Sequence, residues 1–504
     1  MKKNKMIIIS VLISVMLSAC SQPGIVTNQH NKQNENKSDS SFNKEIPNIN
    51  KGFSTIVLDI PDNNYVKLKD ISPHKVPEIN LQIDKNININ LDNNNNTSNS
   101  LNNSLVNMNP QIYYKVSKLS DGFVCASIES IIKKDTETNI EDKKMLVIRR
   151  FDFDGKLLMK KVIKDANYEG RLNSIVSLDN DDFIFYMNNY FEKDKNFLIK
   201  CNKQGKVIWK KQISTLGFDK LNDYFINDKN EIMLTGLSYN NEDKTEEQWN
   251  ILVAKLNMKG NIIKQKYFGG SDYEYIDEVK YNPNYGIVIL GRTSSIDGDF
   301  GVSEKPEMPV DFVACINDDM NLKWVNIDEK NINYEKLLLS DDEIIILGCI
   351  RFTSNLSKVH YIKYNKAGQM TYESNEHNTT MYYNGNILNN GNFIFGKKSK
   401  NENKYELMIY DKNNKLVKRI DNAIDCNEII PTTDGGFIIK AIREIDTVPQ
   451  PVYISSIWYD IEVVLVKFDE NYNMQWRKTY DKYKKSATID FVEVLEDATV
   501  ITDN

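Results

Sequence analysis

A unit of about 50 residues repeats from residue 111 to the end of the chain, and this repeat constrains the fold more than any other feature. Each unit contains an apolar run, a polar turn and a strand that ends in an aromatic or long side chain, as in LIKCNKQGKVIWKK and LVKFDENYNMQWRK. Aligned on that strand, the units share one position, called the marked position below and occupied by Met159, Trp209, Lys264, Trp324, Tyr372, Lys418 and Trp476. A regular period of this length indicates that one supersecondary unit is stacked many times.

A second hairpin recurs between the marked strands, as in SDGFVCASI and NPNYGIVILG. Short strands bounded by Asp, Asn and Gly turns, with no amphipathic helical pattern, predict an all-β chain. Four strands in each unit of this length predict the blades of a β-propeller. A β-solenoid or tandem sandwiches are the alternatives, and their periods fit the spacing less well.

One stretch of the repeat, residues 267–324, carries a more specific pattern than the strands alone. It reads YFGGSDYEYIDEV…YGIVILGRTSSIDGDFG…VDFVACINDDMNLKW and resembles the GGS-type repeat of secreted bacterial β-propellers, within the quinoprotein-like propeller superfamily. The matching residues are Gly269, Gly270, Ser271, Asp277, Gly291, Thr293, Ser295, Asp297, Gly298, Asp299, Asp311, Asn321 and Trp324. The resemblance extends over residues 111–504 as architecture, and it implies a propeller fold while implying almost nothing about activity.

The number of blades can be estimated by counting hairpins. The sequence contains eight inner hairpins, the last at residues 489–502, and seven outer hairpins after residue 111. Because an inner pair alone would leave an unpaired edge, we expect residues 53–69 (FSTIVLDIPDNNYVKLK) to supply the outer strands of the closing blade. This count favours eight blades, the eighth split between both chain ends. Seven blades with a separate C-terminal hairpin are the alternative.

The N-terminal residues 1–19 have the pattern of a signal peptide. Lys2, Lys3 and Lys5 precede an apolar run that is too short to span a membrane. The sequence LSAC that ends at Cys20 resembles the bacterial lipobox, whose Cys carries a diacylglyceryl group. This resemblance implies that Cys20 is lipidated and anchors the chain at the outer face of the bacterial cytoplasmic membrane. An ordinary secretory signal that happens to end in Cys is the alternative.

Two further segments have compositions that cannot bury a core. Residues 20–52 are rich in Ser, Asn, Gln and Lys, and they are predicted to be a disordered tether. Residues 70–110 are predicted to form an Asn-rich loop, because Asn competes with backbone ladders and favours turns.

Charge and cysteine usage exclude some classes of partner and fold. The chain has 64 Lys and Arg against 70 Asp and Glu, a net charge of −6. No nucleic-acid partner is therefore expected, because such binding needs a concentrated positive surface. The five Cys beyond Cys20 are odd in number and scattered, so we expect buried thiols rather than a disulfide framework.

The sequence predicts no catalytic residue. The motifs of metalloproteases, serine hydrolases and P-loop proteins are absent from it, as is a vicinal Cys pair of the quinoprotein dehydrogenase kind. The acidic pairs Asp181-Asp182 and Asp341-Asp342 could serve calcium or acid–base chemistry, but we interpret them as hairpin turns. Asp297 and Asp299 lie in a longer connection, so a structural cation is left open there, and no other cofactor is predicted.

Binding is the function that the loop lengths favour. In a propeller, the second-to-third and blade-to-blade connections emerge on one face, and here they are long at residues 129–143, 239–250, 296–310 and 443–460. Long connections on a rigid scaffold commonly carry binding residues. Aromatic residues there suit a carbohydrate or a protein partner. The candidate ligand contacts are Tyr453, Trp458, Tyr459 and Trp249, with packing onto the blade as the alternative.

The sequence therefore predicts a membrane-anchored extracytoplasmic lipoprotein that serves as a binding or scaffold propeller. The alternative is an extracytoplasmic enzyme that acts on a polysaccharide, or a divergent quinoprotein. A cluster of three or more ionisable groups at the central channel would favour the enzyme.

Overall fold

The computed structural model of the protein describes residues 54–57, 70, 76–81, 114–136, 139–163, 171–188, 196–239, 249–328, 330, 332–353, 356–374, 381–398, 405–423, 426–445, 460–482 and 492–503. Over these ranges the chain forms β-strands and two short 3₁₀ helices, η2 (Ser214–Leu216) and η3 (Gly298–Phe300). The all-β prediction is confirmed. No helix in this part of the chain is both long enough and apolar enough to cross a membrane.

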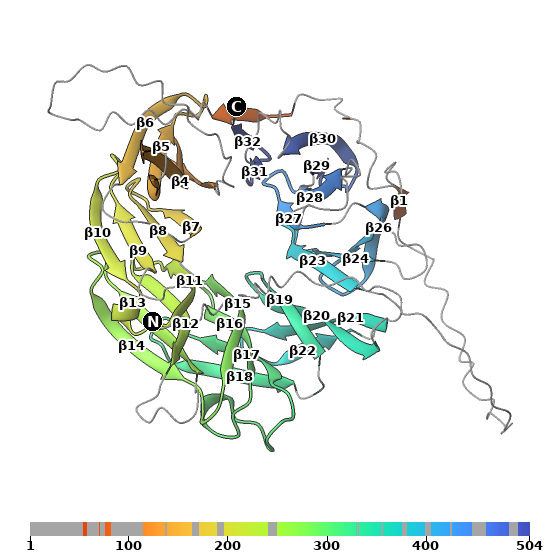
Figure 1. The fold of residues 1–504 in the computed structure, drawn as a ribbon. Helices are drawn as coiled ribbons and strands as arrows, with labels where there is room; N and C mark the ends of the chain where they lie inside the picture. The colour runs from red at the N-terminus through yellow and green to blue at the C-terminus, as the bar shows by residue number, and fades with distance from the viewer. Residues whose placement is uncertain are drawn as a thin grey trace, which may run out of the picture. The chain divides into compact units, whose positions relative to one another are not determined.

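Seven blades of four antiparallel strands, called blades 1 to 7, follow one another in chain order around a ring (Figure 1), and the sheet of blade 6 has a fifth strand at its edge. Blades 1 and 2 comprise β3 (Tyr114–Leu119), β4 (Gly122–Thr136), β5 (Asn139–Phe151), β6 (Leu157–Ile163), β7 (Arg171–Ser177), β8 (Phe183–Asn188), β9 (Phe197–Cys201) and β10 (Val207–Gln212). Blades 3 and 4 comprise β11 (Lys220–Ile226), β12 (Ile232–Tyr239), β13 (Trp249–Leu256), β14 (Ile262–Phe268), β15 (Glu274–Asn282), β16 (Gly286–Thr293), β17 (Val310–Ile316) and β18 (Leu322–Asp328).

The remaining blades continue the same pattern. Blades 5 to 7 comprise β19 (Ile332–Leu339), β20 (Glu343–Thr353), β21 (Leu356–Asn365), β22 (Met370–Glu373), β23 (Met381–Ile387), β24 (Phe393–Lys398), β25 (Tyr405–Tyr410), β26 (Leu416–Ala423), β27 (Glu428–Pro431), β28 (Phe437–Ile445), β29 (Asp460–Phe468) and β30 (Met474–Lys482). In every blade, consecutive strands are hydrogen-bonded neighbours, which is the meander of a propeller blade. The predicted β-propeller is confirmed.

The ring is closed by a smaller sheet of three strands. The C-terminal hairpin, β31 (Val492–Val494) and β32 (Val500–Asp503), is joined by β2 (Glu78–Leu81), which pairs in parallel with β32. Leu81 and Ile501 pack with blade 1, whereas Val492 and Val500 pack with blade 7. The three-stranded sheet therefore lies between the last and first blades, as Figure 1 shows for β31 and β32.

The number of four-stranded blades is seven, the alternative count, and not the eight that the hairpin count favoured. The described part of the expected closing strands, residues 54–57, does not join the closing sheet. Within residues 53–69, the strand β1 (Ser54–Val57) pairs in parallel with β26, at the outer edge of blade 6. The closing strand is Glu78–Leu81, inside the predicted Asn-rich loop, and its four residues are too few to show a strand pattern.

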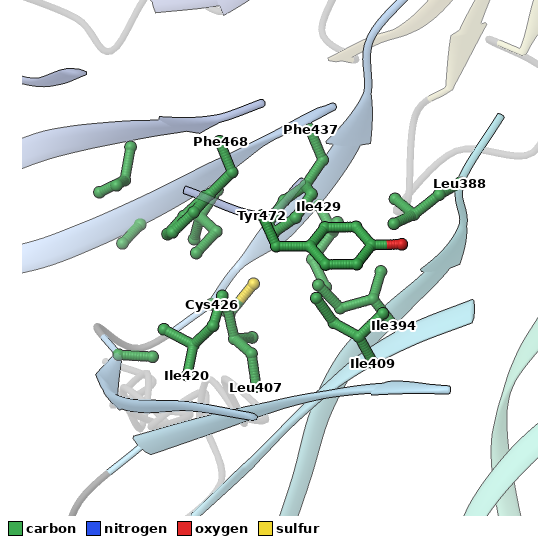
Figure 2. Packing of buried hydrophobic residues seen from close by; sticks show 14 of the residues in the cluster. Leu388, Ile394, Leu407, Ile409, Ile420, Cys426, Ile429, Phe437, Phe468 and Tyr472 are labelled. Atoms are coloured by element: carbon green, nitrogen blue, oxygen red, sulfur yellow. The ribbon is translucent and has the colours of Figure 1, made fainter. Parts of the chain in front are cut away.

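The core consists of side chains that lie between successive sheets. Between blades 6 and 7, the ring of Tyr472 lies over Ile394 and Ile409, and Phe437 and Phe468 belong to the same buried cluster (Figure 2). Eight such clusters occur among the described residues, and each draws its members from two neighbouring sheets. Every blade thus buries both of its faces, which explains why the middle strands are continuous apolar runs.

The polar turns of the repeat are built by one recurring hydrogen-bond pattern. At the turn between the third and fourth strand of each blade, an Asp or Asn oxygen accepts hydrogen bonds from backbone N–H groups further along the turn. The residues are Asp152, Asn202, Asn257, Asn317, Asn365, Asp411 and Asp469. This use of Asp and Asn in local turn bonds accounts for the turn chemistry of the repeat.

In several blades the side chain at the marked position reaches the next blade. Trp209 donates from Nε1 to the carbonyl of Met258 (2.9 Å), and Trp324 donates to the carbonyl of Lys366 (3.2 Å). Both indoles lie against a turn glycine with positive φ, Gly260 or Gly368. In blade 4 the equivalent turn position is Met320 instead of Gly, and the marked residue of blade 3 is Lys264 instead of Trp. Lys264 donates from Nζ to the carbonyl of Asp319, next to Met320.

Several smaller predictions can be compared with the strands. The segment 129–143 was expected to be a long connection, but β4 and β5 pair as far as Thr136 and Asn139, so it is a hairpin extension. The expectation was wrong because charged residues of the segment, such as Lys133 and Glu141, continue the two paired strands. Cys125, Cys201, Cys315, Cys349 and Cys426 are buried and are not joined in disulfide bonds, as expected.

The marked position gives a stability prediction with a matched control. Gly368→Ala should destabilise the fold more than Gly391→Ala, although both glycines have φ near +80°. A Cβ at residue 368 would overlap the indole of Trp324, whereas no atom lies within 4 Å of one at residue 391. We expect a loss of about 1–2 kcal/mol for Gly391→Ala and about 1–3 kcal/mol more for Gly368→Ala. Urea unfolding measures both, and equal losses would contradict the packing role of Trp324.

Candidate functional site

Most of the ligand contacts predicted from the sequence fall outside the described residues. This applies to Tyr453, Trp458 and Tyr459, and to Cys20 with the signal peptide and tether, so all of these stay predictions. Trp249 is described and begins β13, where it pairs with Tyr239. The two rings meet edge to face at 5.5 Å between centroids, and Trp249 packs against the core between blades 3 and 4.

Asp297 and Asp299, where a cation was left open, serve as acceptors for backbone N–H groups. An oxygen of Asp297 accepts from Ser271 N (2.6 Å), and one of Asp299 accepts from Gly269 N (3.2 Å). These bonds attach the GGS turn that precedes blade 4 to the loop between β16 and β17. No group of three or more His, Cys, Asp and Glu side chains suited to a metal ion occurs among the described residues.

The GGS pattern encloses a buried carboxyl that holds these two loops together. Glu274 is fully buried, and its Oε1 accepts from Ser295 Oγ (2.7 Å) and Thr293 Oγ1 (3.1 Å). Ser295 Oγ in turn accepts from Asp272 N (3.0 Å). Burial raises the pKa of Glu274 to about 7. A methyl group at Gly269 would overlap Glu274. This part of the repeat therefore has a structural role, because it holds the two loops together.

A polar cavity lies between the inner strands of blades 3 and 4, which border the centre of the ring. Its volume is about 390 Å³, within the range of roughly 300–1,000 Å³ typical of small-molecule sites. The lining residues are Asn222, Asp223 and Phe225 on β11 and Asp277–Tyr281 on β15. Each strand has a register shift here, at Leu221/Asp223 and at Ile276/Glu278, and such bulges redirect side chains.

Two of the three carboxylates that line the cavity are held by partners. Asp277 accepts two hydrogen bonds from Arg292, from Nε (3.0 Å) and Nη2 (2.7 Å). Glu278 accepts from Lys336 Nζ (3.0 Å) and from the backbone N–H of Leu337 (2.5 Å), both on β19 of blade 5. Lys280 Nζ is 3.9 Å from Glu278, and burial lowers the pKa of Lys280.

Asp223 is the third carboxyl, and its position is costly for the fold. Its Oδ1 accepts from Tyr224 N (2.8 Å), and burial together with the charge of Glu278 raises its pKa to about 6. A carboxyl group whose pKa is raised by burial inside a cavity is common at functional sites. Asp223 is therefore the residue that most distinguishes this cavity from the structural contacts around it.

An aromatic pair lies at the start of β15, beside the Arg292 that binds Asp277. Tyr273 and Tyr275 stack with their centroids 6.1 Å apart and their planes 13° from parallel. The guanidinium of Arg292 lies 5.9 Å from the Tyr275 centroid and also binds Asp277. Tyr275 is 39% exposed, so its ring remains available to a ligand.

A second polar cluster joins the end of β18 in blade 4 to blade 5. Tyr334 donates from its hydroxyl to Asp328 (2.7 Å) and lies 3.2 Å from His360 Nδ1, while His360 Nε2 lies 3.0 Å from Glu373. The Tyr334 ring crosses β20 at Gly348, where a Cβ would overlap it. Tyr334 and His360 are buried, so this cluster braces the blade and offers no open surface to a ligand.

The sequence analysis missed the cavity, although a signal was present. Polar pairs interrupt consecutive inner strands at equivalent places, as Asn222-Asp223, Asp277-Glu278 and Glu335-Lys336. All three stand at the register shift of an inner strand, which the hairpin pattern alone does not reveal. These residues lie within the strands themselves, not in the long connections where binding residues are expected.

No family model and no curated protein matches the chain. Among solved structures, the chain is similar to a protein of unknown function from Bacteroides caccae, with 10% identity, coverage of 71% of this chain and 94% of that chain, and a TM-score of 0.28. It is also similar to the β-propeller domain of the Trilobed protease from Pyrococcus furiosus (8% identity, 70% and 93% covered, TM-score 0.38). A europium-containing methanol dehydrogenase gives 9% identity, 67% and 81% covered, and a TM-score of 0.36. Likenesses this weak carry no argument about function.

The position of Asp223 predicts a pH-dependent gain in stability for Asp223→Asn. The folded pKa of about 6 exceeds the ordinary 3.8, so the folded state holds a proton that the unfolded state releases as the pH rises from about 4 to 6. Stability is therefore lost over that window, by about 2–3 kcal/mol at pH 7. Asp223→Asn should recover part of this loss at pH 7.5 and nothing at pH 3.5, measured by urea unfolding.

The control for this variant is Asp228→Asn, which changes an exposed Asp in the turn after β11. It should alter stability by less than about 0.5 kcal/mol at either pH. If Asp223→Asn were destabilising at pH 7.5, the carboxylate would be contributing to the fold rather than costing it.

Proposed function

We propose that the chain is an extracytoplasmic lipoprotein, anchored through Cys20, whose propeller binds a small polar ligand in the cavity between β11 and β15. The observation that carries the binding part is Asp223, a carboxyl that is kept in a cavity at the expense of stability. The support for the anchor is the sequence alone, namely the Lys-rich start, the short apolar run and the LSAC box. Cavity residues on rigid inner strands suit a preformed site.

Binding is favoured over catalysis by the state of the cavity carboxylates. Glycoside hydrolysis normally uses two carboxyl groups, one as an acid and one as a base or nucleophile. Asp223, with its raised pKa, would suit the acid. The oxygens of Asp277 and Glu278 accept bonds from Arg292, Lys336 and Leu337 N, so the cavity offers no second carboxylate free for that role. The polysaccharide enzyme remains the second candidate on the strength of Asp223.

The long connections between strands are proposed to contribute further ligand contacts. Tyr453, Trp458 and Tyr459 are proposed ligand contacts at the face where the second-to-third connections emerge. Such a rim would add a carbohydrate or protein contact to the cavity. Asp297 and Asp299 are proposed to act through the backbone bonds described above, so no cofactor is part of the proposal.

Localisation tests the anchor. Cys20→Ser should move the protein out of the membrane fraction, because only a thiol can form the thioether to the lipid. Fractionation of cells that express either form, followed by immunoblotting, measures the change, and a replacement at a neighbouring position, Ser21→Ala, is the control. Full membrane retention of a Cys20→Ser protein whose signal peptide has been removed would refute the lipid anchor.

A further inference from the structure

Positive and negative side chains are equal in number in and around the cavity, and this balance limits which ligands can bind there. Three carboxylates and three cations lie in or against the cavity: Asp223, Asp277, Glu278, Lys280, Arg292 and Lys336. An anionic or cationic ligand would meet groups of its own sign as well as of the opposite sign. Because the like-charged contacts oppose the favourable ones, a neutral ligand that both donates and accepts hydrogen bonds fits this arrangement best.

The polar groups of the site are planar and are held in fixed orientations. Arg292 and Asp277 form a two-bond fork whose side chains keep 39% and 22% of their surface exposed. Asn222 is fixed in turn by a bond from Nδ2 to the carbonyl of Ile276 (3.4 Å). Carboxylate, amide and guanidinium groups that are already oriented can each contact two adjacent hydroxyl groups at little cost in entropy.

Aromatic rings lie beside these polar groups at two places, in the cavity wall and next to the Arg292–Asp277 pair. In the cavity wall, Phe225 and Tyr281 stack with centroids 6.0 Å apart. Beside the fork, the half-exposed ring of Tyr275 continues the surface outwards. A sugar ring has hydroxyl groups around its edge and C–H groups on its faces, so it needs both kinds of contact in the same place.

We propose that this site binds a neutral oligosaccharide, with one sugar unit in the cavity against Asp223 and the next unit against Tyr275. The inference rests on the proposed binding function and adds the chemical class of its ligand. The cavity volume of about 390 Å³ fits a short segment of such a chain, and Tyr275 lies beside Arg292, whose partner Asp277 lines the cavity. A free sugar and a wall polysaccharide share this chemistry, and the length of the glycan used in the test separates them.

The test measures binding by the full mature chain that carries Cys20→Ser, so that it stays in solution. Isothermal titration at pH 7.5 is carried out with the neutral glycans chitohexaose, cellohexaose and maltohexaose and with their monosaccharides. Hexagalacturonate and a decapeptide of Gly and Ser are the charged and peptide comparators. We expect at least one neutral hexasaccharide to bind more tightly than its monosaccharide, because only the longer chain reaches Tyr275.

Two variants and two controls tie the binding to the site. Asp223→Asn should weaken binding roughly ten- to a hundredfold through the loss of a charged acceptor, although it is expected to stabilise the fold. Tyr275→Ala should weaken binding about tenfold, whereas Tyr267→Ala, which removes a 49% exposed ring on the outer strand of blade 3, should leave it within about twofold. Asp228→Asn should also leave it unchanged. A loss of affinity without a loss of stability cannot arise from unfolding.

The other outcomes separate the two proposals. Tighter binding of hexagalacturonate or of the peptide, with the same dependence on Asp223, would overturn the neutral oligosaccharide and leave the binding function intact. Unchanged affinity in Asp223→Asn would overturn the assignment to this cavity. Shorter sugars found by chromatography of the same mixtures would replace the binding function with hydrolysis, and binding of none of the probes would refute both proposals.

Discussion

The structure depends on face-to-face packing between successive sheets. Each blade carries apolar side chains on both faces, and each face is covered by the next sheet in the ring. The arrangement is stable only if the last sheet also meets the first, because an open ring would expose two such faces to water. Three short strands close the ring: the two strands of the C-terminal hairpin, and β2 from the N-terminal part of the chain. Glu78 of β2 also accepts hydrogen bonds from Lys478 and Tyr480 of blade 7.

Features that depend on contacts between residues close in sequence could be predicted, whereas features that depend on distant residues could not. The repeat predicted the hairpins and their turns, because Asn202 and Asn365 bond to backbone groups only a few residues away. It also located the marked position, where Trp324 meets the next turn. The closing strand escaped prediction, because β2 pairs with a segment more than 400 residues away and has only four residues of its own.

The site was predicted less well, for a related reason. Long loops and aromatic residues can be read from sequence, but the cavity exists only because two strands from different blades approach each other. The same distinction separates two buried acids. Burial raises the pKa of both, but Glu274 accepts bonds from the hydroxyl groups of Thr293 and Ser295 within the GGS pattern that resembles a known repeat. Asp223 accepts a backbone bond and lines the cavity. Nothing in the local sequence distinguishes the two roles.

The most direct measurement of this account compares two truncated chains, one that begins at Asp70 and one that begins at residue 82. The first keeps β2, and the second lacks it together with the buried side chains of Val76 and Leu81. If closure by β2 supports the ring, the shorter chain should lose about 3–6 kcal/mol of unfolding free energy relative to the longer one, from the burial of these two side chains. Equal stability of the two chains in urea would contradict the claim that the ring depends on this strand.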